Sequence, residues 1–170
     1  MKLSESLEAA FNAQITLEFQ ASLVYRQLSI ELDLMDLSGI SRWFRQQADE
    51  EILHAHKFID HVADRDNHPR IGAVQAPSAV VGSVLAAFEA AYAHEQKVSD
   101  SIRNLYRQAE AEGDLDSRPL LNWFLEEQIE EEATVSEIVG RVKMIDDDGP
   151  GLLRLDEELG ARTSATADAG

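Results

Sequence analysis

Four long stretches of the chain carry apolar residues at alternating spacings of three and four. That spacing matches one face of an α-helix, so the sequence predicts four amphipathic helices over about residues 4–35, 38–66, 78–111 and 116–146. Ser4 and Ser38 are expected N-caps, while Gly113 and the run Gly149-Pro150-Gly151 are expected to end the third and fourth helices. A fold built from such helices must bury their apolar stripes against one another.

The connections between these stretches set how the helices pair. Only a few residues join the first stretch to the second and the third to the fourth, and short links make neighbouring helices antiparallel. The link over residues 67–77 contains Pro69 and Pro77, which argue against helix there. Extended, such a link covers about 30 Å. The expected fold is therefore all-α: a four-helix bundle of two antiparallel hairpins joined by a long crossover.

The segment after the Gly-Pro-Gly run predicts a short fifth helix. Residues 152–159 contain four leucines, which is more than a solvated tail needs. This helix either caps its own bundle or contacts another subunit, and the sequence leaves both readings open. Residues 1–160 are expected to form one domain, and residues 161–170, which are small and polar, are expected to form a disordered tail.

Composition excludes several classes of protein. The 170 residues include 15 Lys and Arg against 32 Asp and Glu, a net charge of -17, which repels nucleic acid and anionic membranes and attracts cations. Taken alone, the charge is better explained by simple solubility. Cysteine is absent, so disulfides and thiolate metal sites are excluded. No apolar run approaches a membrane span and the first residues lack a secretory signal, so a cytoplasmic setting is expected.

Each of the four apolar stripes is interrupted by a glutamate near its middle. These residues are Glu18, Glu51, Glu95 and Glu131, and His54 follows Glu51 by three positions. A lone glutamate on such a stripe is normally a salt-bridged or rim residue. Four buried carboxylates at one level would repel one another and cost several kcal/mol each, unless bound metal supplies the positive charge.

The residue types narrow the choice of metal. Carboxylate oxygens with one imidazole suit iron or manganese, and zinc is an alternative. Two ions fit the charge better than one. The pattern also repeats: Glu18 precedes Glu51-x-x-His54, and Glu95 precedes Gln128-x-x-Glu131. Each hairpin thus supplies one lone glutamate and one i, i+3 pair, although di-iron bundles usually have Glu-x-x-His in both hairpins.

The chain resembles the heme-free bacterial ferritins, of the ferritin-like di-iron family, over about residues 4–160. The resemblance is carried by Glu18, Tyr25, Glu50-Glu51-x-x-His54, Glu95 and the segment 123–132. It implies an iron-storage ferritin that oxidises Fe(II) with oxygen or peroxide and keeps the ferric product as mineral inside a hollow homo-oligomeric shell of 24 subunits. A reductase would release the iron.

The resemblance also implies roles for individual residues. Glu18, Glu51 and His54 would bind one iron, and Glu51, Glu95 and Glu131 would bind the second, with Gln128 beside it. A third iron site would use Glu50, Glu127 and Glu130 and share Glu131. Glu127 and Glu130 read equally well as a solvated acidic face. Tyr25 would hydrogen-bond a ligand or donate an electron, or be an ordinary core tyrosine.

Three alternatives remain open at this stage. Bacterioferritin is the close rival, but it has a histidine where Glu131 stands and a heme-binding methionine where Ile52 stands, so no heme is expected. A di-iron oxygenase or peroxidase would need a pocket, and large residues such as Phe44, Phe88 and Phe124 leave none obvious. A helical interaction module would bind no iron. The remaining histidines are expected at the surface or at interfaces, although His61 could face the core; they are His56, His61, His68 and His94.

Overall fold

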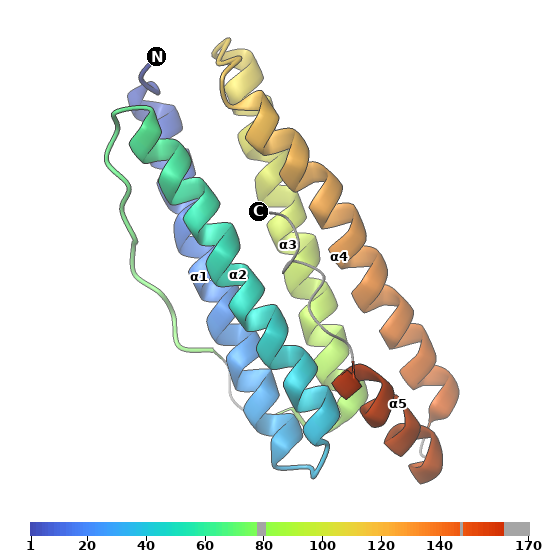
Figure 1. Cartoon of the computed structure of the whole chain (residues 1–170). Coiled ribbons are helices and arrows are strands. Elements are labelled where there is room, and N and C mark those ends of the chain that lie inside the picture. The colour runs from blue at the N-terminus through green and yellow to red at the C-terminus, as the bar shows by residue number, and fades with distance from the viewer. Residues whose placement is uncertain (78–80, 147, 162–170) are drawn as a thin grey trace.

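The computed structural model describes residues 1–77, 81–146 and 148–161. Its helices are α1 (Glu5–Asp33), α2 (Ser38–Asp64), α3 (Val84–Ala111), α4 (Arg118–Ile145) and α5 (Gly149–Ala161). The hairpins α1–α2 and α3–α4 pack side by side, and the crossover runs along the outside of α1 (Figure 1). The predicted all-α bundle is confirmed. The predicted tail, apart from Ala161, lies outside the described residues.

The helix starts agree only partly with the sequence expectation. Ser4 is the N-cap of α1, because its Oγ accepts a hydrogen bond from the Leu7 amide at 3.1 Å. Ser38 is the first residue of α2 and not its cap. The expected start of the third helix at Ser78 lies outside the described residues, and α3 begins only at Val84, where Ser83 caps it. At the starts of α1 and α3, the capping serine has extended backbone and accepts a hydrogen bond from an amide of the first turn.

The long connection between α2 and α3 is tied to one face of α1. Three polar side chains at four-residue intervals on α1 bond to its backbone: Asn12 and Thr16 accept from the Arg70 and Gly72 amides at 2.8 Å, and Gln20 accepts from the Gln75 amide at 2.7 Å. Residues four apart share a helix face. The crossover therefore follows α1 in an extended course, as its prolines predict.

The fifth helix differs most from expectation. The sequence predicts Gly149-Pro150-Gly151 outside any helix, yet these residues form the first turn of α5. Proline is tolerated there because amides in the first turn of a helix have no partner within the helix, so its missing N–H costs nothing. Leu155 and Leu159 are buried against the bundle, so α5 caps its own subunit. Asp156 also accepts a hydrogen bond from the Ile40 amide at 2.7 Å and so completes the start of α2.

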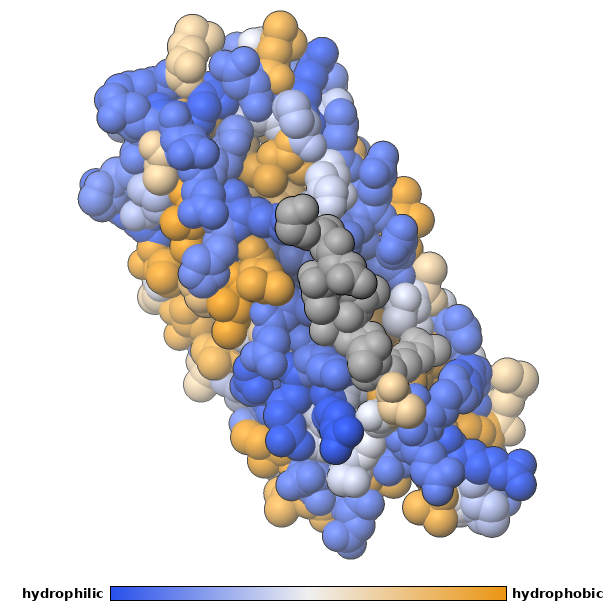
Figure 2. All heavy atoms as spheres, in the orientation of Figure 1, coloured by the Kyte–Doolittle hydropathy of each residue, from blue (hydrophilic) through white to orange (hydrophobic). Residues whose placement is uncertain are grey.

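The bundle core consists of two apolar clusters, one on each side of the predicted level of the acids. One contains Tyr25, Phe44 and Phe88, and the other contains Phe11, Phe58 and Phe124. Hydrophilic side chains cover most of the face in Figure 2, with apolar patches between them. None of the described helices is long and apolar enough to cross a membrane.

Candidate metal centre

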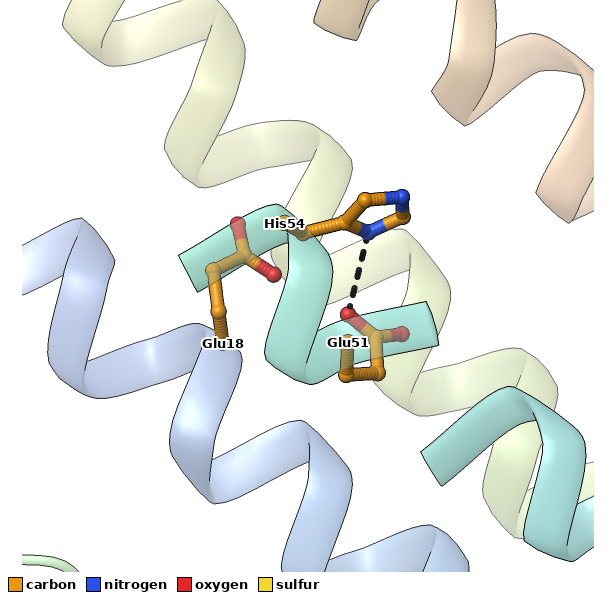
Figure 3. A group of neighbouring side chains, drawn as sticks. All are labelled: Glu18, Glu51 and His54. Carbon is orange, nitrogen blue, oxygen red and sulfur yellow. Dashed lines mark hydrogen bonds and ion pairs between the residues drawn. The ribbon is translucent and has the colours of Figure 1, made fainter. Parts of the chain in front are cut away.

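Glu18 of α1 and Glu51 and His54 of α2 form a compact group inside the bundle (Figure 3). Their possible ligand atoms all lie within 4.8 Å of one another, and each residue is at most 4% exposed. Glu51 and His54 share a helix face because they are three residues apart, and His54 Nδ1 lies 3.3 Å from Glu51 Oε2. Two carboxylates and an imidazole converging on one point can bind a divalent cation.

Glu18 has one satisfied oxygen and one without a partner. Its Oε1 accepts a hydrogen bond from Gln14 Nε2 at 2.7 Å, and Gln14 is in turn oriented by Ser101 of α3 at 2.6 Å. Its Oε2 is buried and has no hydrogen-bond partner. Burial, followed by the charge of Glu51, raises the pKa of Glu18 well above its ordinary value. A buried carboxylate oxygen that has no hydrogen-bond donor is suited to bind a cation.

Glu95 of α3 is held by two donors. Tyr25 donates its hydroxyl hydrogen to Glu95 Oε1, and Gln128 Nε2 of α4 donates to Glu95 Oε2 at 3.1 Å. Burial raises the pKa of Glu95, while the bonds from Tyr25 and Gln128 act to lower it. Tyr25 is itself buried, and burial raises the pKa of its hydroxyl well above the ordinary value. Tyr25 is therefore a protonated donor that fixes Glu95.

Glu131 of α4 is half-buried, and other acids surround it. Burial raises its pKa well above the ordinary value, and the charges of Glu95, Glu50, Glu127 and Glu130 raise it further. Burial likewise raises the pKa of Glu51, with Glu95 and Glu131 adding to the effect. The predicted acids thus interact electrostatically across the bundle. Within the described residues, however, only Glu18, Glu51 and His54 are near enough to count as one compact metal-binding group.

The residues predicted for a third ion differ in exposure. Glu50 and Glu127 are half-buried and Glu130 is exposed. Gln47 donates a hydrogen bond to Glu50 on the same helix. The charges of Glu50, Glu127 and Glu130 each raise the pKa of Glu131.

Two aromatic residues of α4 fix the His54 ring. Trp123 and Phe124 meet it edge-on, with ring centroids at 5.7 and 5.5 Å. In the sequence, Trp123 stands out only as part of the segment 123–132, and Phe124 only as one of the large residues that leave no obvious pocket. Both contacts cross from one hairpin to the other, so helical periodicity within a single stretch carries no signal for them.

The other histidines agree only partly with the expectation that they lie at the surface or at interfaces. His56 and His68 are exposed. His61 Nε2 lies 2.8 Å from Ser117 Oγ, away from the metal group. His94 was expected at the surface or an interface, but it is half-buried beside Tyr25, with its Nε2 buried and unpartnered. Burial, with Lys97 nearby, lowers the pKa of His94 to about 4.

The fold and the site together define a class: a helical bundle with a candidate metal site made of buried carboxylates and a histidine. Residues 8–145 match the family model described as a ferritin-like domain. The bacterial non-heme ferritin of Staphylococcus aureus strain USA300 is 35% identical over 161 residues, covering 95% of this chain and 97% of that protein. The Staphylococcus saprophyticus bacterial non-heme ferritin is also 35% identical, covering 95% of this chain and 96% of its own length.

Solved structures agree with the relatives. An open pore ferritin from the archaeon Archaeoglobus fulgidus superposes with a TM-score of 0.94 at 37% identity, covering 96% of this chain and all of that one. A closed form of the Archaeoglobus fulgidus ferritin, engineered by site-directed mutagenesis, superposes with a TM-score of 0.93 at 37% identity, covering 95% of this chain and 99% of that one. The chain belongs to the ferritin family, and its function is iron storage.

Proposed function

We propose that this chain oxidises Fe(II) to Fe(III) at a two-iron ferroxidase centre inside its bundle before the iron is stored. The observation that carries the proposal is the buried group of Glu18, Glu51 and His54, in which one carboxylate oxygen has no partner. Buried acids without a cation are costly, and Fe(II) removes that cost on binding. Iron is the substrate of this reaction.

The proposed ligands divide between two ions. Glu18, Glu51 and His54 take the first, and Glu51, Glu95 and Glu131 take the second, with Gln128 holding Glu95 in place. Supporting this division, Gln128 donates to Glu95, and Glu95 and Glu131 both raise the pKa of Glu51. Tyr25 positions Glu95 through its hydroxyl. For a third ion we propose Glu50, Glu127 and Glu130 with Glu131.

The buried acids also handle protons. Because burial raises the pKa values of Glu18, Glu51 and Glu131, these groups favour the protonated form when empty and release protons when a cation binds. Carboxylate ligands favour Fe(III) over Fe(II) because they offset the extra positive charge. Each Fe(II) gives one electron. Two electrons and two protons convert oxygen to hydrogen peroxide, and two more of each convert peroxide to water.

The wider setting follows the family likeness. We propose a homo-oligomeric shell of 24 subunits in the cytoplasm, with ferric mineral inside and a reductase that releases iron. We also propose that heme is not bound, because Ile52 occupies the position of the heme-binding methionine and Glu131 replaces the second histidine.

Glu51→Ala tests the proposed centre, since Glu51 would contact both ions. The measurement is the rate of Fe(III) formation after aerobic addition of Fe(II), followed by size-exclusion chromatography with iron and protein assayed across the peak. We expect Glu51→Ala to lose the fast phase and keep its assembly size. Glu126→Gln, at an exposed position on α4, is the matched control. Unchanged fast oxidation in Glu51→Ala would refute the assignment.

A further inference from the structure

A groove opens on the surface beside the metal group. Its volume is about 360 Å³, and it is lined by residues of α2 and by Trp123 of α4; among them are Glu50, His54, His56, Lys57, Asp60 and Trp123. His54 is only 3% exposed, yet its side chain forms part of the groove wall. His54 therefore belongs both to the wall of this groove and to the candidate metal group.

The Lys57 ammonium covers Trp123 at this point. Its Nζ lies 4.4 Å from the centroid of the Trp123 ring, a cation–π contact between the two hairpins. The same Trp123 ring meets His54 edge-on, with centroids 5.7 Å apart. Lys57, Trp123 and His54 thus form a continuous series of contacts from solvent to the metal group. Lys57 itself is exposed, and a cation–π contact at an exposed position is weak enough to open thermally.

The charges in the groove act in opposite directions on an entering cation. Glu50 and Asp60 attract it. Lys57 repels it, and does so at the contact next to His54. A single positive charge in a confined path raises the barrier to a divalent ion, and it does so less at high ionic strength. His54 Nε2 points away from both Glu18 and Glu51, whose carboxylates lie on the Nδ1 side (Figure 3).

We infer that this groove is the route by which divalent cations reach Glu51 and His54, and that Lys57, resting on Trp123, is the gate of that route. The inference rests on the proposed function, because it needs a cation site behind His54. The gate opens when Lys57 swings off the indole into solvent. The ion then passes His54 from the Glu50 and Asp60 side. Lys57 is a positioning residue and not a ligand.

The test measures cation entry without oxidation. Metal-free protein is mixed with Co²⁺ under anaerobic conditions, and the visible absorption of bound Co²⁺ gives association and dissociation rates at low and high salt. The variants are Lys57→Gln, which removes the charge, and Lys57→Arg, which keeps the charge and can still stack on the Trp123 ring. Lys143→Gln is the matched control, because it removes the same charge near the far end of α4, where Lys143 pairs with Glu89.

We expect Lys57→Gln to bind Co²⁺ about fivefold faster at low salt, on the scale of one charge close to a divalent ion's path, with the gain shrinking as salt rises. The dissociation of Co²⁺ should also become faster, so that Kd changes by a smaller factor than either rate constant. Lys143→Gln should behave as the parent chain, and Lys57→Arg, which keeps the charge, should bind Co²⁺ no faster than the parent chain. Unaltered association in Lys57→Gln, or a change confined to dissociation, would overturn the gate. Failure of the parent chain to bind Co²⁺ at all would overturn the proposed centre and the gate with it.

Discussion

Replacing Glu18 by glutamine should stabilise the metal-free protein at neutral pH. Glutamine keeps the shape and can still accept the hydrogen bond from Gln14, but it removes a buried carboxyl whose Oε2 has no partner. Burial raises the pKa of Glu18 above its ordinary value of 4.5, so folding at neutral pH requires the group to take up a proton or to carry an uncompensated charge.

The ordinary pKa of a glutamate limits how much the buried Glu18 carboxyl can destabilise the folded protein. Keeping a carboxyl of pKa 4.5 protonated costs at most about 3 kcal/mol at pH 7 and at most about 1 kcal/mol at pH 5, on the scale of roughly 1.4 kcal/mol per pH unit. The sign follows from the raised pKa: the stability that Glu18 provides is complete below pH 4.5 and is lost as pH rises toward the folded-state pKa. We expect Glu18→Gln to gain about 1–3 kcal/mol at pH 7, or about 2–9 °C in Tm.

The assay is thermal unfolding by circular dichroism in a chelator at pH 5 and pH 7. Glu126→Gln, at an exposed site, is the control and should leave Tm nearly unchanged at both pH values. Added Zn²⁺ should raise the Tm of the parent chain more than that of Glu18→Gln, because the variant lacks a ligand charge. A gain in Tm that is equal at the two pH values, or a loss at pH 7, would refute the reasoning.

Two further predictions concern the ends of the bundle. Gly39→Ala should destabilise by about 2–5 kcal/mol, because the added Cβ would lie 1.9 Å from the Asp156 carbonyl oxygen and would push α5, with its buried Leu155 and Leu159, off the bundle. Limited proteolysis of α5 and Tm report it, and Gly140→Ala, with open space around the new carbon, should lose nothing. Arg65→Met should cost about 3–5 kcal/mol by urea unfolding, since it strips both guanidinium bonds, at 2.7 and 3.3 Å, from the buried Asp114. A midpoint equal to that of the parent chain would contradict this role of Arg65.

Much of the architecture follows from local sequence. The three- and four-residue spacing defines the buried face of each long helix, and the prolines of the crossover prevent helix there. The same spacing places Glu18, Glu51 and Glu95 inside the bundle, because a residue on an apolar stripe is buried with its neighbours. Glu51 and His54 meet because they are three residues apart on one helix.

Other features depend on contacts between segments far apart in the chain. The start of α2 is completed by Asp156, which is 116 residues away, and the burial of His94 depends on Tyr25 of another helix. Gln14 can orient Glu18 only because Ser101 of α3 reaches it. The periodicity of one helix carries no information about its partner's side chains. The sequence by itself therefore determined which face of each long helix is buried. Only the tertiary structure decided which side chains contact one another, because those contacts depend on how the two hairpins pack.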